Sequence, residues 1–361
     1  MPHIAPDLPE GAVLSASQCT VPVAIPPGGT DLKEWLFAMS DGAWRACSPD
    51  HIAAAVSPGA ELRLLLVQVL DGSPLVHRYA VEARTPSHLS LRSQSDLFHP
   101  LGQGPLDMTW DLLLEDGRLS STLTARTTPA LVALLAQEEG ALRDWPACAD
   151  AYLADTMPRL ARNLEAMAGG GKPDTVPEPA PLEDRGAILG ESACRAVIET
   201  PISSLDVSAW LFGLSEEDYR RCSTTHVSAG TSGGGEGRRL SINVEQPGSL
   251  LIQHYQEVVG ESRHCRVVSP RSEVFLGERR STLHVTWDLR LDLIDAGRTQ
   301  LTNTVVVRTT PEFEGFLEAA GIPLAAAQAS RGAIIAAHNA EETPGFARDM
   351  ERKARLAAAA L

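Results

Sequence analysis

The stretch EWLFAMSDGAWRACSPDHIAAAV, residues 34–56, has a second copy later in the chain, AWLFGLSEEDYRRCSTTHVSAG, residues 209–230. Aligned residues of the two copies are 175 positions apart, and both copies contain the pattern Cys-Ser-x-x-His, which ends at His51 and at His226. Self-similarity of this length indicates a structural unit that occurs twice.

The repeat extends over most of the chain. Further matches occur at spacings that grow from 176 to 182: Tyr79 with Tyr255, MTWDLLL (108–114) with VTWDLRL (285–291), and Thr-Thr-Pro (127–129) with Thr-Thr-Pro (309–311). Each step in the spacing falls in a turn-like stretch, where an insertion costs least. We therefore infer that one domain is duplicated in tandem.

A linker-like segment lies between the copies. Its sequence, AGGGKPDTVPEPAPLED, is rich in glycine, proline and acidic residues and has no periodic apolar pattern. The composition predicts a first domain over residues 1–167, a linker over 168–184 and a second domain over 185–361.

Composition excludes some classes of protein. The 361 residues carry a formal charge of −15, which argues against a nucleic-acid backbone or an anionic membrane surface as partner. No window approaches about 18 uncharged apolar residues, and the first residues lack the pattern of a signal peptide, so we expect no membrane span. Six cysteines without a CxxC motif predict reduced thiols and a cytoplasmic location. The oligomeric state is left open.

Each copy shows the same order of expected elements. A short strand is followed by two short helices, about five antiparallel strands and a long helix. The second short helix is expected to begin at Ser40 or Ser215, and the Thr-Thr-Pro motif to end the last strand and cap the long helical region. Ser48 and Ser223 are expected to be N-caps as well, because Pro49 follows Ser48 and proline is preferred in the first turn of a helix.

This order predicts an α+β fold with two tandem domains of the same architecture. In each domain a curved antiparallel sheet wraps around a long C-terminal helix, because sheet and helix each bury one apolar face on the other. A cavity between them is a usual place for a small ligand.

The element order and the TWDL…TTP tail of both copies resemble the START/Bet v 1-like superfamily (SRPBCC, polyketide cyclase-like). The resemblance covers about 135 residues of each copy, and the tandem arrangement resembles the di-domain polyketide aromatase/cyclases. It implies two tandem helix-grip domains and a hydrophobic small-molecule ligand. Members of the superfamily also include Hsp90-ATPase activators, so the resemblance admits a protein-interaction module too.

Two interpretations of Cys-Ser-x-x-His remain open. On one continuous helix the cysteine and histidine would share a face and could ligate a metal or form a thiolate–imidazole pair. With a helix boundary at Ser48 and Ser223 that geometry fails, and the motif becomes a structural corner whose histidine can line a pocket. The second interpretation is favoured, so we expect neither a metal nor a cofactor.

The second copy is the more polar and is the better candidate for chemistry. Its strand RRLSINVEQ alternates apolar with polar residues, whereas the first copy has Leu65 and Val67, or residues near them, at the positions of Asn243 and Glu245. The candidate catalytic residues are His226, Tyr255 and His254. The candidate ligand-binding residues, aromatic or polar, are His51, Tyr79, Trp110, Trp287, Asn243 and Gln253.

Three functions are compatible with the sequence. The first is binding of a hydrophobic small molecule with cyclase- or dehydratase-type processing, as a lyase or isomerase without a metal. The second is a non-catalytic carrier of lipids or isoprenoids, and the third is an interaction module. A cavity with convergent His, Tyr or Glu favours an enzyme, whereas an apolar cavity favours a carrier.

Overall fold

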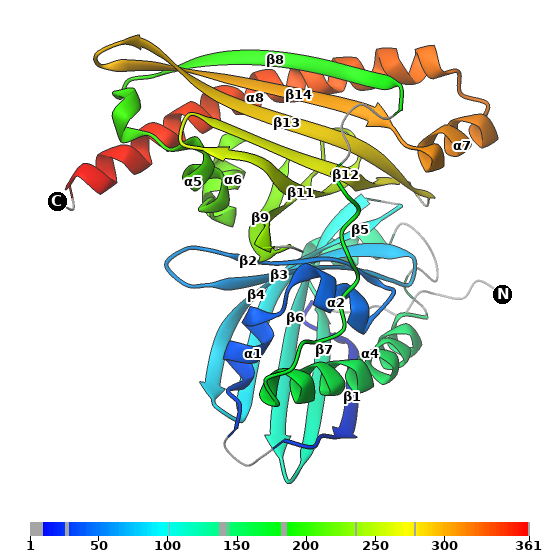
Figure 1. Cartoon of the computed structure of the whole chain (residues 1–361). Coiled ribbons are helices and arrows are strands. Elements are labelled where there is room, and N and C mark those ends of the chain that lie inside the picture. The colour runs from blue at the N-terminus through cyan, green and yellow to red at the C-terminus, as the bar shows by residue number, and fades with distance from the viewer. Residues whose placement is uncertain are drawn as a thin grey trace. The chain divides into compact units, whose positions relative to one another are not determined.

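The structure is a computed structural model that describes residues 10–25, 29–100, 102–136, 142, 144–181, 186–234, 237–277 and 279–359 (Figure 1). The chain forms two compact units, one of residues 1–56 and 60–177 and the other of residues 57–59 and 178–361. The division after Pro177 falls inside the Gly/Pro-rich segment. The expected boundary at 184/185 lies outside the described residues.

The first unit follows the expected order closely. Its described elements are β1 (Val13–Pro22), α1 (Leu32–Ala38), α2 (Asp41–Cys47), β2 (His51–Ser57), β3 (Arg63–Leu70), β4 (Ser73–Thr85), β5 (His88–His99), β6 (Gly102–Glu115), β7 (Arg118–Thr127), α3 (Pro129–Leu135) and α4 (Trp145–Ala168).

The second unit repeats this order with one short 3₁₀ helix added. Its described elements are β8 (Ile188–Ile198), η1 (Ile202–Ser204), α5 (Val207–Phe212), α6 (Glu216–Cys222), β9 (His226–Gly233), β10 (Arg239–Glu245), β11 (Leu250–Glu261), β12 (His264–Leu276), β13 (Arg279–Asp295), β14 (Arg298–Thr309), α7 (Pro311–Ala320) and α8 (Leu324–Ala359).

Each unit has one antiparallel sheet and one long helix on it. The described strands lie in the order β1-β7-β6-β5-β4-β3-β2 in the first unit and β9-β10-β11-β12-β13-β14-β8 in the second. Helix α4 packs on β1, and α8 packs along β8 and β14 (Figure 1). The α+β class and the helix-grip arrangement are therefore confirmed in both units, with sheets that do not close into barrels.

The segment after Cys-Ser differs from the sequence-based expectation. Ser48 and Ser223 are the C-caps of α2 and α6, not the N-caps of a further helix. A turn follows, and His51 and His226 each begin a strand. The expected boundary between Cys and His is present, but the residues that follow it form a strand, His51–Ser57 in the first unit, and not a helix. This adds a strand to the number expected in each unit.

The other caps agree with the sequence. Asp31, Ser40 and Ser215 accept hydrogen bonds from backbone N–H groups of the helices that they precede. Thr128 and Thr310 do the same for the Thr-Thr-Pro helices, in which proline occupies the first turn. A threonine oxygen at this position satisfies one of the unpaired N–H groups of the first turn.

Each unit has its own apolar core between sheet and helix. In the first unit the buried residues include Trp44, Trp110 and Trp145, and in the second they include Trp210, Trp287 and Phe346. None of the described helices combines the length and the apolar composition needed to cross a membrane.

Glycine 345 lets α8 approach α6 closely. A Cβ atom at Gly345 would lie 2.5 Å from the carbonyl oxygen and 2.6 Å from the Cα of Cys222. Real Cβ atoms do not approach backbone that closely, so only glycine allows this contact.

We predict that Gly345→Ala destabilises the second unit by about 1–3 kcal/mol, because helix or backbone must move to relieve the overlap. Gly315 in α7 has no atom within 4 Å of its would-be Cβ. Gly315→Ala is therefore the matched control and should stabilise by about 0.5–1 kcal/mol. Denaturant unfolding measures both, and equal effects of the two substitutions would contradict the close packing.

Candidate functional site

Polar residues of β9, β10 and β11 line one face of the second sheet. Register places His226 opposite Glu245, Asn243 opposite Gln253, and Ser241 opposite Tyr255. Directly opposed residues in antiparallel strands point to the same face. This is the face toward α8, because Glu245 contacts His338 of that helix. We call it the inner face of the second unit.

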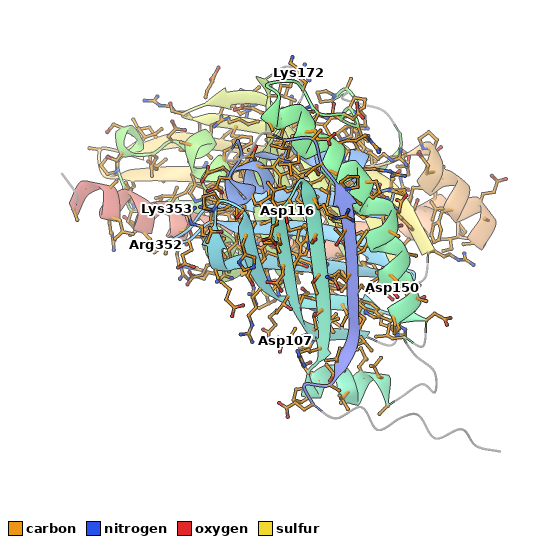
Figure 2. The ribbon with its side chains drawn as sticks, turned by 90° about the horizontal axis from the view of Figure 1, so that it is seen from below. Asp107, Asp116, Asp150, Lys172, Arg352 and Lys353 are labelled. Carbon is orange, nitrogen blue, oxygen red and sulfur yellow. The ribbon has the colours of Figure 1, made fainter. Side chains whose placement is uncertain are left out.

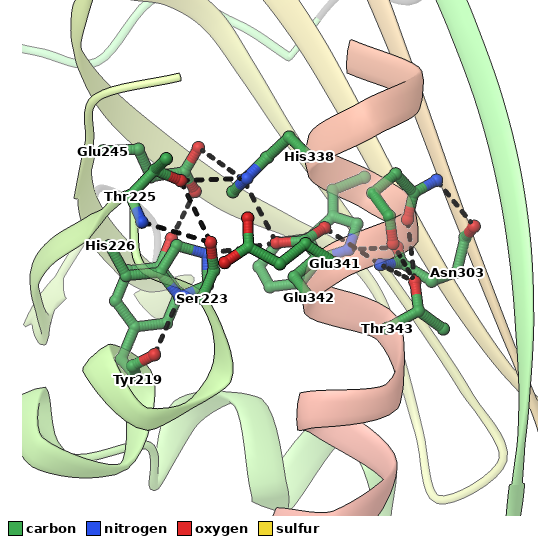
Figure 3. A network of polar contacts seen from close by, with 12 residues as sticks. Tyr219, Ser223, Thr225, His226, Glu245, Asn303, His338, Glu341, Glu342 and Thr343 are labelled. Atoms are coloured by element: carbon green, nitrogen blue, oxygen red, sulfur yellow. Dashed lines mark hydrogen bonds and ion pairs between the residues drawn. The ribbon is translucent and has the colours of Figure 1, made fainter. Parts of the chain in front are cut away.

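The charged centre of the inner face consists of His226, Glu245, His338 and Glu342 (Figure 3). One nitrogen or oxygen atom of each lies within 4.8 Å of the corresponding atoms of the others. His226 Nε2 is 3.1 Å from Glu342 Oε2, and His338 Nε2 is 3.3 Å from the same oxygen and 3.4 Å from Glu245 Oε2. We refer to these residues as the His–Glu cluster.

Neighbouring elements orient the His–Glu cluster. The His226 ring stacks on Tyr219 of α6 with centroids 3.7 Å apart, and its Nδ1 is 2.7 Å from the Tyr219 carbonyl oxygen. The Tyr219 hydroxyl donates a hydrogen bond to Glu245. His338 Nδ1 is 3.0 Å from Thr225 Oγ1.

Glu342 is held by a residue of β14, on the same inner face of the sheet. Asn303 Nδ2 of β14 donates to Glu342 Oε1 at 3.0 Å. Asn303 Oδ1 in turn accepts a hydrogen bond from Trp287 Nε1 at 2.7 Å. Packing of a core tryptophan thus fixes the amide that orients Glu342.

Electrostatics within the His–Glu cluster favour the charged forms of His338, Glu342 and Glu245. Burial disfavours the protonated form of His338, but Glu245 and Glu342 outweigh it and raise the pKa of His338 to about 11. Burial likewise disfavours ionised Glu342, yet the close contacts with His226 and His338 outweigh burial and lower the pKa of Glu342 to about 2. The pKa of Glu245 is lowered as well, because His338 outweighs the effect of burial.

Two amides beside the His–Glu cluster keep an unpartnered atom. Asn243 Nδ2, a donor, and Gln253 Oε1, an acceptor, are buried and have no hydrogen-bond partner among the described residues. The other atoms of these amides are used: Asn243 Oδ1 accepts from Ser241, and Gln253 Nε2 donates to Glu245 Oε2 at 3.4 Å.

The first unit has a counterpart for each cluster position. In β3 and β4, Leu66 lies opposite His77 and Gln68 opposite Leu75, which aligns Leu66 with Asn243 and Gln68 with Glu245. The expected counterparts Leu65 and Val67 are one position out of register, so they belong to the opposite face.

The long helices align through equivalent bonds. Trp35 Nε1 donates to Asn163 of α4, and Trp210 Nε1 donates to Asp349 of α8. Asn163 and Asp349 are 186 positions apart, and so are the prolines inside the two helices, Pro158 and Pro344. Tyr152 then corresponds to His338 and Thr156 to Glu342.

The first unit therefore builds the same site from neutral residues. His51 Nδ1 is 2.7 Å from the Trp44 carbonyl oxygen, and its Nε2 is 2.7 Å from the Tyr152 hydroxyl. His51 and His226 thus occupy equivalent places, but only His226 faces a carboxylate. His77 stacks on Tyr79, its Nδ1 is 2.7 Å from Ser95 Oγ, and its buried Nε2 has no hydrogen-bond partner in the described part of the chain.

The structure brings most of the sequence-predicted residues to the two inner faces. His226, Tyr255, Asn243, Gln253 and Trp287 lie on that of the second unit. His51, Tyr79 and Trp110 lie in the interior of the first, with the Tyr79 and Trp110 rings 5.7 Å apart.

His254 does not join the site. It lies opposite Ile242, on the face away from α8, and its backbone N–H donates to Ser269 Oγ at 2.9 Å. The cysteines of Cys-Ser-x-x-His do not join it either. Burial raises the pKa of Cys47 and of Cys222 to about 12, so both thiols stay protonated and a thiolate–imidazole pair is excluded.

Sequence reasoning missed Tyr219, His338 and Glu342 as site residues. His338 and Glu342 are four residues apart on α8, the spacing that places two side chains on one helix face. That pattern was visible in HNAEE. The alternation of apolar and polar residues in RRLSINVEQ is typical of a strand with one buried face, but both faces of β10 are buried and the polar one faces α8.

A surface groove of about 370 Å³ lies along the C-terminal half of α8, lined by Arg348, Glu351, Arg352, Arg355 and Leu356. Arg352 and Lys353, which Figure 2 labels, lie on α8. Arg352 pairs with Asp218 and Asp349, each at 2.6 Å, and Lys353 lies 3.1 Å from Asp218. These pairs join α6 to α8, and the groove shares no lining residue with the His–Glu cluster.

We predict that acid destabilises the first unit through its buried histidines. Burial lowers the pKa of His51 to about 4 and that of His77 to about 3. The unfolded chain takes up protons below pH about 6.5, before the folded unit does, so stability falls as pH falls from there toward 4. The loss is about 3 kcal/mol for each histidine.

Hydrogen exchange of first-unit peptides between pH 7 and 4 measures this loss. His77→Gln, which introduces the residue of the second unit, should make the pH dependence shallower. His88→Gln changes an exposed histidine and should leave it unchanged. An unaltered slope in His77→Gln would contradict the assignment.

No protein-family model and no curated protein sequence matches the chain. Among solved structures it is similar to the di-domain ARO/CYC StfQ from the steffimycin biosynthetic pathway, with 12% identity over 95% of this chain and 99% of that chain and a TM-score of 0.33. It is also similar to the Zhui aromatase/cyclase from Streptomyces sp. R1128, with 15% identity over 46% of this chain and 96% of that chain and a TM-score of 0.34.

A START superfamily protein from Mycobacterium smegmatis matches with 9% identity over 46% of this chain and 98% of that chain, with a TM-score of 0.27. The helix-grip assignment itself stands on the element order and strand register of each unit.

Proposed function

We propose that the second unit binds a small hydrophobic molecule that carries carbonyl and hydroxyl groups. The observation that carries this proposal is the neighbouring pair of Asn243 Nδ2 and Gln253 Oε1, both buried and without a hydrogen-bond partner in the part of the chain that the structure describes. Leaving a buried polar group unpaired costs about 1–3 kcal/mol. A ligand whose carbonyl accepts from Asn243 and whose hydroxyl donates to Gln253 would remove both costs.

Aromatic side chains beside these amides suit an apolar ligand. The Tyr255 ring lies 5.4 Å from that of Trp287, which lies 5.6 Å from Phe346 of α8. Rings offer large apolar area with few rotatable bonds, which favours binding of flat or aromatic molecules.

The chemistry that we propose is carbonyl polarisation of the aromatase/cyclase or dehydratase type. Burial raises the pKa of Tyr255 well above its ordinary value, so this residue would act as a hydrogen-bond donor or acid and not as a base. Tyr255 and the Asn243 amide, both directed to the inner face, would stabilise negative charge on an oxygen of the substrate.

The first unit fits a non-catalytic role better. At the positions of Ser241 and Asn243 it has Leu64 and Leu66, both in its apolar core. We propose that it acts as a scaffold or as a carrier-like binding unit, and that residues 168–184 link it to the second. The six cysteines are unpaired, in keeping with the proposed cytoplasmic location.

Native mass spectrometry of the purified full chain tests for a co-purified ligand. A bound small organic molecule, one per chain, is expected. Its release on denaturation allows its carbonyl and hydroxyl groups to be identified.

We predict that Asn243→Leu, which installs the residue of the first unit, weakens binding of 1-hydroxy-2-acetonaphthone about 3- to 10-fold. This is the loss expected for one neutral hydrogen bond. Titration of tryptophan fluorescence measures the affinity.

Naphthalene, which has the same rings without oxygen, is the control ligand, and its affinity should change less than about twofold. Leu66→Asn is the reciprocal control and should leave the affinity of the ketone in the second unit unchanged. Equal loss for both ligands, or no binding of the ketone to the wild-type chain, would contradict the proposal.

A further inference from the structure

The His–Glu cluster contains a conflict of hydrogen-bond acceptors. The Tyr219 carbonyl oxygen, 2.7 Å from His226 Nδ1, can only accept, so Nδ1 carries the hydrogen. In a neutral ring the lone pair of Nε2 then faces Glu342 Oε2 at 3.1 Å, and an ionised carboxylate oxygen also only accepts. Two acceptors at this distance require either a further proton or a cation that both can bind.

His338 directs its Nε2 to the same carboxylates. Its Nδ1 lies 3.0 Å from the Thr225 hydroxyl, which can accept a hydrogen bond. Nε2 then faces two carboxylate oxygens, at 3.3 and 3.4 Å, and neither contact meets hydrogen-bond geometry. Both imidazoles therefore direct Nε2 to one point between the carboxylates.

The separations suit one small ion. Bonds of about 2.0–2.2 Å in a tetrahedral site place the ligand atoms roughly 3.4 Å apart. The three contacts above measure 3.1, 3.3 and 3.4 Å, and the remaining pairs stay within 4.8 Å. A shift of less than about 1 Å in the side chains would complete the coordination.

Each would-be ligand is also held from behind. His226 is fixed by the Tyr219 carbonyl, His338 by Thr225, Glu245 by the Tyr219 hydroxyl and Glu342 by Asn303. Outer partners of this kind set the tautomer and the direction of metal ligands. Two neutral imidazoles and two carboxylates also balance the charge of one divalent ion.

We propose that His226 and His338, through Nε2, and Glu245 and Glu342, through one oxygen each, bind a divalent first-row transition ion of the zinc type. The mixed nitrogen and oxygen donors favour Zn²⁺, Co²⁺ or Mn²⁺ over Mg²⁺ and Ca²⁺, which prefer oxygen alone. The first unit, with Gln68, Tyr152 and Thr156 at three of these positions, has no comparable donor set.

The metal site goes beyond the proposed ligand-binding function and replaces the expectation of a protein without metal. It needs no organic ligand for its test. Glu342 contacts His226, His338 and Asn303, and none of its polar contacts among the described residues involves Asn243 or Gln253. Loss of the metal site through Glu342 therefore leaves the proposed ligand contacts intact, and the two proposals can fail separately.

The first experiment uses the full chain after treatment with a chelator and dialysis. One equivalent of Co²⁺ should bind and give the visible absorption of a four- or five-coordinate ion, and Zn²⁺ should displace it. Bound Zn²⁺ should also raise the unfolding temperature. Absence of binding at one equivalent would overturn the proposal in favour of a proton-balanced ion-pair cluster. A near-ultraviolet thiolate band would overturn it in favour of cysteine ligation.

The second experiment installs the neutral residues of the first unit. Glu245→Gln, His338→Tyr and Glu342→Thr should each lower Co²⁺ affinity by about 100-fold or more, because a ligand is lost. Asn303→Ser, which changes only an outer partner, should lower it by about 10-fold. His264→Gln alters a part-exposed histidine that pairs with Asp288 and should have no effect.

A variant that gains a Co²⁺ site distinguishes loss of a metal ligand from loss of the fold. Gln68→Glu, Tyr152→His and Thr156→Glu together should give the first unit a second Co²⁺ site, so that the full chain binds two ions. Unchanged Co²⁺ affinity in Glu245→Gln and Glu342→Thr, or a triple variant that folds but binds one ion, would overturn the proposal.

Discussion

The architecture of the second unit depends on how two buried carboxylates, Glu245 and Glu342, are compensated. A carboxylate inside a protein is costly unless charge and hydrogen bonds are supplied to it. Here His226 and His338 face the two carboxylates, and Tyr219 and Asn303 supply hydrogen bonds to them. The close contact of α8 with α6 at Gly345 is what brings the helix residues to the sheet residues.

The duplicated domain offers an internal comparison of the same frame with and without charge. In both units a histidine that begins a strand contacts a carbonyl oxygen through Nδ1 and a long-helix residue through Nε2. In both, a core tryptophan donates to a residue of the next strand, Ser121 or Asn303. The same frame therefore occurs with neutral partners in the first unit and with ionisable partners in the second.

Much of the fold was predictable from local patterns. The tandem repeat, the caps at Ser40 and Ser215 and the Thr-Thr-Pro helix starts depend on residues close together in sequence, and the structure confirms them. The interpretation of Ser48 and Ser223 as N-caps was wrong, because a serine that ends one helix resembles a serine that starts the next. The strands at His51 and His226 are settled by pairing with distant partners.

By itself the sequence determined that there are two copies, the α+β class, and which residue types distinguish the second copy. Only the tertiary structure decided that Asn243 and Glu245 face the helix, that His254 does not, and that His338 and Glu342 complete a site begun by His226. The physical reason is that facing direction depends on which side of a sheet a helix covers. That choice is made by packing over more than a hundred residues of separation, which no local periodicity records.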